Sequence, residues 1–253
     1  MASATPWLIR APSNASARIR LFCFPYAGGS AAIYRSWQSA LQPGVEVCPV
    51  QLPGRGSRMR EPSFTRIGPL LAAAAEALRP YMDMPFAFFG HSMGAIVSFE
   101  LARLLRREYG LMPRHLFLSG RSAPQTPDAD SVTYNLPDEE FVEELHNLGG
   151  TPKEVLEHPE LLRLMMPVVR ADFEVSQTYR YTSEPPLDCP FTVFGGLEDV
   201  DASRERLEAW REHTSGAFSL RMFPGNHFFL NTAEPLLLRT LASILYHAAE
   251  IGP

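Results

Sequence analysis

Short apolar runs alternate with longer amphipathic stretches along the chain, and this alternation limits the folds that the sequence can adopt. Several runs are apolar at consecutive positions, which is typical of strands in a parallel sheet that is covered on both faces. The stretches between them have helical spacing. This rhythm predicts an α/β fold with a mostly parallel, doubly wound sheet, whose ligand binds beyond the carboxyl ends of the strands. The predicted strands are Arg18–Phe24, Val45–Gln51, Phe86–Phe89, His115–Ser119, Phe191–Phe194 and Ser219–Phe223. The predicted helices are Ala32–Leu41, Phe64–Tyr81, Met93–Tyr109, Ser203–Thr214 and Pro235–Ala249.

The rhythm is interrupted once, from about Ala123 to Pro186. This stretch has no clear core strand, and a connection between parallel strands rarely needs so long a segment. We therefore predict a helical lid over the active-site edge, inserted at residues 123–186 of a single domain that spans residues 1–253. An ordinary pair of surface helices is the alternative. The helices predicted in the insertion are Asp138–Leu148, Lys153–His158 and Pro159–Tyr179.

Composition limits the class of protein. A chain of 253 residues that is 45% hydrophobic can bury the core of one globular domain. The formal net charge of −5 argues against a nucleic-acid binder, whose footprint would be a basic patch. Met1–Pro12 lacks the features of a signal peptide, and no apolar stretch is long enough to cross a bilayer. We therefore expect a cytoplasmic protein that does not bind membranes.

The three cysteines, Cys23, Cys48 and Cys189, are too few and too scattered for a disulfide framework. They lie in or beside apolar runs, so we expect buried free thiols that pack as small hydrophobes. None has metal-ligand spacing to a histidine, and the sequence predicts no metal site.

The pentapeptide Gly90-His91-Ser92-Met93-Gly94 lies between the apolar run Phe86–Phe89 and the helical pattern Ala95–Glu108. A G-x-S-x-G pattern is weak alone, but between a strand and a helix it is typical of a nucleophile elbow, a strained turn that exposes a serine hydroxyl above the sheet. Glycines are needed there because a side chain would collide with the neighbouring strand or helix. Ser92 is therefore the predicted nucleophile, and His91 is predicted to be a packed residue of the elbow.

A serine hydroxyl needs a base to accept its proton and an acid to orient that base, and in this fold the order is Ser, then Asp or Glu, then His. His227 follows Pro224-Gly225-Asn226 directly after the last predicted strand, where the base must lie. The loop after the preceding strand offers three carboxylates. Asp199 is the preferred acid, although spacing alone leaves Asp201 and Glu198 open.

The oxyanion that develops in such a reaction needs two preorganised backbone amides. One is normally that of the residue after the nucleophile, here Met93. The other comes from the loop after an early strand, and the glycines of Phe24–Gly29 allow an amide to turn toward the site, which makes Ala27 the predicted donor. This loop lacks the Lys-Ser/Thr ending of a phosphate-binding P-loop.

With these residues in place, the chain resembles the type II thioesterases of polyketide and nonribosomal peptide biosynthesis, from about Arg18 to the last helix. The shared stretches are FPYAGGS, QLPGRGSR, GHSMG, GGLEDVDASRERLEAW and FPGNHFFL, together with LPDEEFVEELHNLGGTPKEVL, ELLRLMMPVVRADFEVSQTYRY and PPLDCPFTVFGG. The chain departs from the family at Asn226, where a second glycine is usual, and at Leu197, where an acidic or polar residue is usual.

The resemblance implies an α/β-hydrolase fold in which Ser92 is the nucleophile, Asp199 the acid and His227 the base. It favours Asp199 over Asp201, and it assigns the oxyanion hole to the amides of Ala27 and Met93. The implied reaction is hydrolysis of an acyl thioester on the phosphopantetheine arm of an acyl or peptidyl carrier protein, with no metal or organic cofactor. We expect a monomer.

Other functions stay open beside this editing activity. A medium-chain fatty acid synthase thioesterase or a product-releasing thioesterase would share the fold and the triad. A lipase or esterase would prefer oxygen esters. A noncatalytic scaffold that binds carrier proteins would typically have lost one member of the triad.

Carrier proteins are typically acidic, so two arginine clusters are candidates for docking. They are Arg55, Arg58 and Arg60 after the second predicted strand, and Arg103, Arg106 and Arg107 on the helix after the elbow. Solvated surface arginines are the alternative. If Arg55 or Arg58 docks the carrier, charge reversal there would weaken hydrolysis of carrier-bound but not of small thioesters.

Overall fold

The structure, a computed structural model, describes residues 5–9, 14–126, 132–149 and 158–250. Six strands form one sheet in the order β2-β1-β3-β4-β5-β6, and every neighbouring pair is parallel. They are β1 Ile19–Phe24, β2 Val45–Pro49, β3 Phe86–His91, β4 Leu116–Ser119, β5 Phe191–Gly196 and β6 Phe218–Phe223. All six predicted strands are thus confirmed, and only their ends differ.

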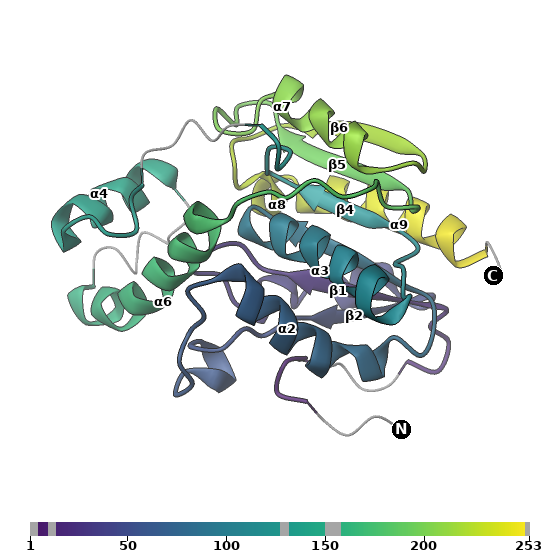
Figure 1. Ribbon diagram of the computed structural model, residues 1–253, viewed down its shortest axis with the longest axis horizontal. Helices are drawn as coiled ribbons and strands as arrows, with labels where there is room; N and C mark the ends of the chain where they lie inside the picture. Colours follow the sequence, from purple (N-terminus) through teal and green to yellow (C-terminus); the bar gives the residue numbers. More distant parts are fainter. Residues whose placement is uncertain (1–4, 10–13, 127–131, 150–157, 251–253) are drawn as a thin grey trace.

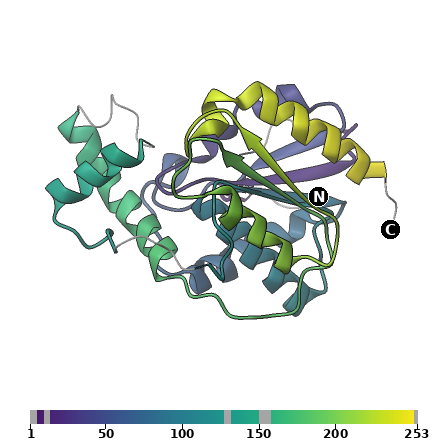
Figure 2. The same ribbon diagram turned by 90° about the horizontal axis from the view of Figure 1, so that it is seen from above.

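Helices cover both faces of the sheet (Figures 1 and 2). One apolar core contains side chains of α2, α3 and α7, and a second contains side chains of α1 and α9 on the opposite face. The strands β1 to β5 are almost wholly buried between these layers, which explains why their sequences are apolar at consecutive positions. The fold is the predicted doubly wound α/β arrangement.

Four of the five predicted helices outside the insertion differ in detail, and Met93–Tyr109 alone matches from end to end. In place of the predicted helix Ala32–Leu41 there is a 3-10 turn, which Ser30 caps, followed by a short helix whose N-cap is Ser36. Phe64–Tyr81 begins later, since Arg66 is extended. The helices are η1 Ala31–Tyr34, α1 Trp37–Leu41, η2 Gly56–Arg58, α2 Ile67–Leu78, η3 Arg79–Tyr81, α3 Met93–Tyr109, α7 Arg204–Glu208, η4 Ala209–His213, α8 Phe229–Thr232 and α9 Glu234–Glu250.

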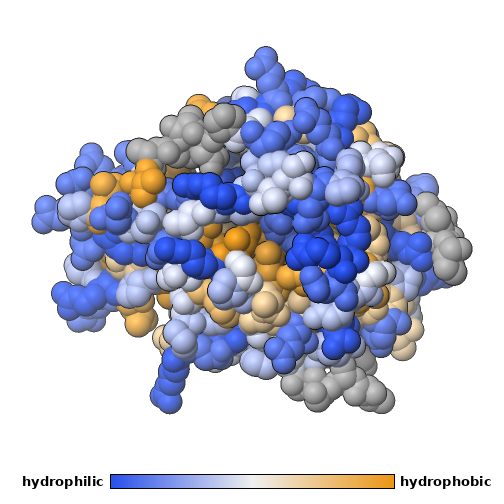
Figure 3. All heavy atoms as spheres, viewed as in Figure 1, coloured by the Kyte–Doolittle hydropathy of each residue, from blue (hydrophilic) through white to orange (hydrophobic). Residues whose placement is uncertain are grey.

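The inserted stretch contains α4, Asp138–Leu148, and α6, Pro159–Thr178, which lie together beside one edge of the molecule (Figure 1). They share a small core of their own that includes Phe141 and Val169. The predicted helix Lys153–His158 lies outside the described residues except for His158, which is the N-cap of α6. Figure 3 shows apolar side chains gathered near the centre of this face of the molecule, with hydrophilic ones around them.

The turn between β3 and α3 has the strained geometry of a nucleophile elbow. Ser92 has φ of 54° and ψ of −117°, in the region that side chains rarely adopt. A Cβ atom on Gly90 would lie 2.0 Å from the carbonyl oxygen of Gly94, and one on Gly94 would lie 2.2 Å from the carbonyl oxygen of Phe24. Both glycines are therefore required by contacts with backbone, which cannot move aside as a flexible side chain could.

We expect Gly94→Ala to lower the free energy of unfolding by about 4 kcal/mol or more, in the range of the severest single substitutions, because the new methyl group meets fixed backbone. The matched control is Gly68→Ala in α2, where an added Cβ would meet nothing within 4 Å. The free energy of unfolding of Gly68→Ala should differ from that of the wild type by less than about 1 kcal/mol. Alanine favours a helix more than glycine does, but the proline that follows disfavours the helical conformation at this position, so the two effects oppose each other. Urea unfolding followed by circular dichroism measures both, and equal midpoints for the two variants would contradict the account.

Candidate active site

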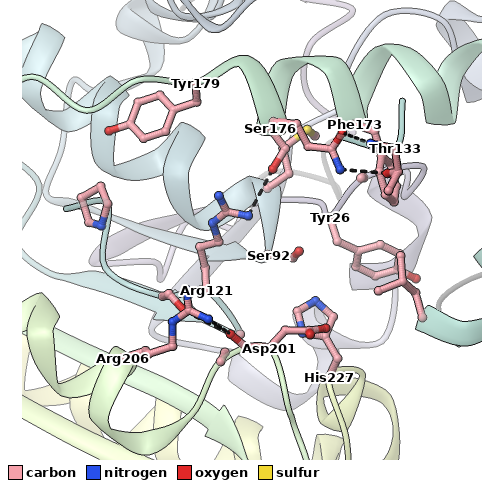
Figure 4. Close-up of a pocket in the computed structure, with 18 of the residues that line it drawn as sticks. Tyr26, Ser92, Arg121, Thr133, Phe173, Ser176, Tyr179, Asp201, Arg206 and His227 are labelled. Carbon is pink, nitrogen blue, oxygen red and sulfur yellow. Dashed lines mark hydrogen bonds between the residues drawn. The ribbon is translucent and has the colours of Figure 1, made fainter. Parts of the chain in front are cut away.

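Ser92 lies at a cavity of about 500 Å³ beyond the carboxyl ends of the strands, where ligands of such sheets bind. The loop after β1 contributes Ala27, the elbow contributes Ser92 and Met93, and the loop after β6 contributes His227 (Figure 4). The structure thus brings four of the five predicted site residues to one cavity. The fifth, Asp199, lies directly behind His227.

Asp199 orients the imidazole of His227. Its Oδ2 atom lies 2.8 Å from Nδ1 of His227, while its Oδ1 atom accepts hydrogen bonds from the backbone amides of Asp201 and Ala202 at 3.1 and 3.2 Å. This bond leaves Nε2 of His227 to accept a proton, as a general base requires. Of the three carboxylates that spacing left open, Asp199 thus has a hydrogen bond to His227, the predicted base.

Burial by itself would raise the pKa of Asp199, but the hydrogen bond and charge of His227 and the two backbone amides together hold the pKa below its ordinary value. A carboxylate in this environment stays ionised near neutral pH. Asp201 has a different place. Asp201 is one of the residues that line the cavity, and its carbonyl oxygen accepts a hydrogen bond from the Ser122 hydroxyl at 3.2 Å.

Within the described residues, the Ser92 hydroxyl makes no hydrogen bond to His227, although both side chains face the same cavity (Figure 4). Catalytic hydrogen bonds commonly tighten only when substrate is bound. The elbow holds the Ser92 hydroxyl above the sheet. A ligand in the cavity can therefore reach it.

His91 is a packed residue of the elbow, as predicted. It is fully buried, its Nδ1 lies 2.9 Å from the Ser119 hydroxyl, and its ring lies 5.1 Å from that of His227 between centroids. Burial and the neighbouring His227 hold its pKa well below the ordinary value, so His91 is neutral near pH 7. Gly120 is required beside it, because an added Cβ would lie 2.6 Å from the His91 ring.

The insertion forms the wall of the cavity opposite the sheet. Apolar side chains of α4 and α6 line this wall, and polar side chains alternate with them. The apolar residues are Leu145, Leu148, Val169 and Phe173, and the polar ones include Thr133, Ser176 and Gln177. The sequence predicts a lid here, but its pattern does not indicate which side chains of the lid face the cavity. Arg121 and Ser122 were not predicted either, although both follow the buried strand β4 and that position is itself the signal that could have found them.

The expectation that Arg55 and Arg58 dock a carrier protein is wrong. Their side chains are only 7% and 5% exposed, because Arg55 is paired with Asp172 and Arg58 with Glu61. A buried, paired guanidinium cannot offer its charge to a partner.

The cluster on α3 is also largely engaged within the molecule. Arg103 is buried between Glu100 and Glu184. Arg106 and Arg107 contact Glu184 as well, so the three side chains tie the segment that follows α6 to α3.

Among the described residues, no group of three or more His, Cys, Asp or Glu side chains could hold a metal ion. No helix in this part of the chain is both long and apolar enough to span a membrane. The three cysteines are buried free thiols, as predicted.

A parallel α/β sheet with a serine at the elbow after β3 and a histidine–aspartate pair after its later strands is an α/β-hydrolase arrangement. The family model described as Thioesterase domain matches residues 19–245. The chain belongs to this family, and it is a hydrolase that acts on thioesters.

Individual relatives agree with the resemblance inferred from the motifs. The chain is 48% identical to Linear gramicidin dehydrogenase LgrE of Brevibacillus parabrevis, over 96% of this chain and 94% of that protein. It is 46% identical to Gramicidin S biosynthesis protein GrsT of Aneurinibacillus migulanus, over 88% of each. The solved structure of the type II thioesterase BorB from the borrelidin biosynthetic cluster superposes with a TM-score of 0.88 at 35% identity, over 99% of this chain and 100% of that one. The word dehydrogenase is part of the name of LgrE; this sequence has no G-x-G-x-x-G dinucleotide fingerprint.

Replacing Asp199 with Asn should lower kcat by a factor on the order of 10³ to 10⁴, because the amide favours the wrong tautomer of His227. Glu198→Gln is the matched control, since Glu198 is the exposed neighbour of Asp199, and Asp201→Asn tests the rival acid. Steady-state hydrolysis of a small thioester measures all three. A larger loss in Asp201→Asn than in Asp199→Asn would reverse the assignment.

The lowered pKa of Asp199 also predicts a pH dependence of stability. Because the pKa is lower in the folded than in the unfolded chain, the stabilisation is present above the unfolded value of about 3.9 and is lost as pH falls through the folded value. The difference in unfolding free energy between the wild type and Asp199→Asn should therefore shrink on acidification below about pH 4. A difference that grows on acidification would contradict the lowered pKa.

Proposed function

We propose that this protein is a type II, editing thioesterase, which removes acyl groups from the phosphopantetheine arm of acyl or peptidyl carrier proteins in polyketide or nonribosomal peptide biosynthesis. The observation that carries the proposal is the position of Ser92 at a cavity of about 500 Å³, a size in the range of small-molecule sites. The relatives named above, which belong to gramicidin and borrelidin biosynthesis, support the pathway class.

In the proposed mechanism, Nε2 of His227 accepts the proton of Ser92 as Oγ attacks the thioester carbonyl carbon. The carbonyl oxygen becomes an oxyanion, which the amides of Ala27 and Met93 stabilise. Collapse of this tetrahedral species breaks the C–S bond, and the departing thiolate takes the proton from His227. Water, deprotonated by His227, then attacks the acyl-Ser92 ester, and the acid leaves as the proton returns to Ser92.

The assigned roles draw on side chains and backbone amides of this chain alone, so no metal or organic cofactor is part of the proposal. The protein acts as a monomer in the cytoplasm, and its partner is the carrier protein that delivers the acyl group.

The cavity wall bears on the choice between this function and that of a medium-chain fatty acid synthase thioesterase. Arg121 and Ser176 contact each other across the cavity at 3.2 Å, and Gln177 contacts Thr133 at 2.8 Å (Figure 4). A long saturated chain packed on these polar groups would remove water from them without offering hydrogen bonds, which is unfavourable. Short or partly polar acyl groups suit such a wall better.

The proposal is tested with carrier proteins loaded with acetyl, propionyl, hexanoyl and dodecanoyl groups, and with the matching coenzyme A thioesters. We expect turnover of the carrier-bound thioesters, with the dodecanoyl group hydrolysed more slowly than the shorter ones. Ser92→Ala should reduce the rate to the uncatalysed background, whereas Ser98→Ala, further along the same helix, should retain it.

Three outcomes would contradict the proposal. Strong preference for the dodecanoyl group would favour the fatty acid synthase type, and preference for oxygen esters would favour an esterase. Wild-type turnover by Ser92→Ala would remove Ser92 from the chemistry.

A further inference from the structure

A carboxylate of the insertion reaches the loop to which the first oxyanion amide is assigned. Asp172 lies on α6 and is only 3% exposed. Its Oδ2 atom accepts a hydrogen bond from the backbone amide of Gly28 at 2.7 Å. Gly28 directly follows Ala27, so this contact joins α6 to the oxyanion loop, which we define as residues 24–30.

Arg55 completes the contact from the loop after β2. Its guanidinium donates to both oxygens of Asp172, at 2.5 and 2.7 Å, and also to the backbone carbonyl of Gly29 at 3.1 Å. A bidentate pair of this kind fixes orientation as well as distance. Asp172 and Arg55 therefore hold an amide and a carbonyl that follow Ala27 in the chain.

The packing at the same point is close. Gly28 has φ of 76°, a left-handed conformation that favours glycine, and an added Cβ would lie 3.0 Å from Cγ2 of Val169. Val169 and Asp172 are three residues apart on α6 and so lie on one face of the helix. This face of α6 rests on the oxyanion loop at Gly28.

We propose that Asp172, held by Arg55, is a positioning residue that sets the oxyanion loop and couples its geometry to the position of α6. The proposal rests on the proposed function, because it takes the amide of Ala27 as an oxyanion donor. The hydrogen bonds to Gly28 and Gly29 restrict the backbone that follows Ala27, and preorganised donors are what stabilise an oxyanion. A shift of α6 away from the loop would break the Gly28 contact and loosen the hole.

Arg55 has a second part in this arrangement. A carboxylate near a developing oxyanion would oppose its negative charge, and the paired guanidinium neutralises that carboxylate. Removal of Arg55 should therefore harm the reaction more than removal of the charge of Asp172.

The variants are Asp172→Asn, Arg55→Gln, the double variant of both, and the conservative Arg55→Lys. The double variant matters because removal of one partner leaves a buried charge unpaired, whereas removal of both does not. Glu174→Gln is the matched control. Glu174 is also a carboxylate on α6 that pairs with an arginine of the body, Arg66, but this pair lies at the surface.

Two activity readouts separate positioning from general stability, and both are scaled to the folded fraction measured by circular dichroism. For hydrolysis of hexanoyl-N-acetylcysteamine, Asp172→Asn should lower kcat by roughly 10- to 100-fold, with little change in KM. This loss is smaller than the roughly 10²- to 10³-fold loss caused by removal of an oxyanion-hole donor, because the donor is displaced and not deleted. Arg55→Gln should lose more, Arg55→Lys less, and Glu174→Gln little.

The second readout compares a hexyl trifluoromethyl ketone, which forms an oxyanion adduct on a serine, with the methyl ketone of the same chain length. Affinity for the trifluoromethyl ketone should fall by about the same factor as kcat/KM, while affinity for the methyl ketone should not change. Equal weakening of both ketones, or a kcat unchanged in both Asp172→Asn and the double variant, would overturn the proposal.

A third readout does not need activity. Hydrogen exchange at the amide of Gly28 should be faster in the Asp172 variants than in the wild type and in Glu174→Gln. If the wild type hydrolyses no thioester, the proposed function fails, and this exchange still decides whether Asp172 holds the loop. Unchanged exchange at Gly28 would refute the contact itself.

Discussion

The close approach of the first turn of α3 to the end of β1 is the contact on which the site depends. The backbone of Gly94 lies so near the carbonyl group of Phe24 that no Cβ atom fits between them. Because of this approach, the elbow that carries Ser92 and the loop that carries Ala27 are held side by side. The same approach puts the start of α3, with the amide of Met93, at the cavity. One packing constraint thus brings together the proposed nucleophile and both proposed oxyanion donors.

The rest of the machinery comes from parallel neighbours in the sheet. The strands β5 and β6 are adjacent and parallel, so the loops at their carboxyl ends meet, and Asp199 and His227 meet with them. The insertion adds what the sheet cannot provide, a wall opposite Ser92 and the buried carboxylate of Asp172. The body therefore holds the groups proposed to react, while the insertion both limits the space of the cavity and contacts the oxyanion loop.

Much of this arrangement could be predicted from the sequence, because its signals are local. Consecutive apolar residues mark buried strands, and the glycines of the elbow mark a turn that no other residue can make. Four of the predicted site residues meet at one cavity, with Asp199 bonded to His227 behind it, for the same reason: each follows the carboxyl end of a parallel strand or begins the helix after one. The acid is harder to predict, because Asp199 and Asp201 both lie near the end of β5 and spacing does not separate them. The family resemblance favours Asp199, and the bond to His227 agrees with that choice.

What the sequence could not provide were contacts between distant segments. The segment that contains Arg55 and Arg58 has the composition of a basic surface loop. No feature of the neighbouring sequence indicates that Asp172, 117 residues away, neutralises Arg55 inside the protein. The contact between Arg121 and Ser176 is of the same kind, because they become neighbours only when the insertion folds over the sheet, although the position of Arg121 after β4 is itself a local signal. The exact starts of the shorter helices depend on single capping residues such as Ser30. A capping serine is hard to recognise in a sequence, because many other serines do not cap a helix.

In the proposed function, Ser92 carries the acyl group between the carrier protein and water. The decisive experiment is rapid mixing of the wild-type protein with a hexanoyl-loaded carrier protein, acid quenching within the first turnover, and mass spectrometry of the digested protein. We expect a hexanoyl ester on the peptide that contains Ser92, which forms and decays at rates that match release of the acid. Acid release with no acyl group on that peptide at any time in the turnover, or an acyl group found only on another residue, would contradict it.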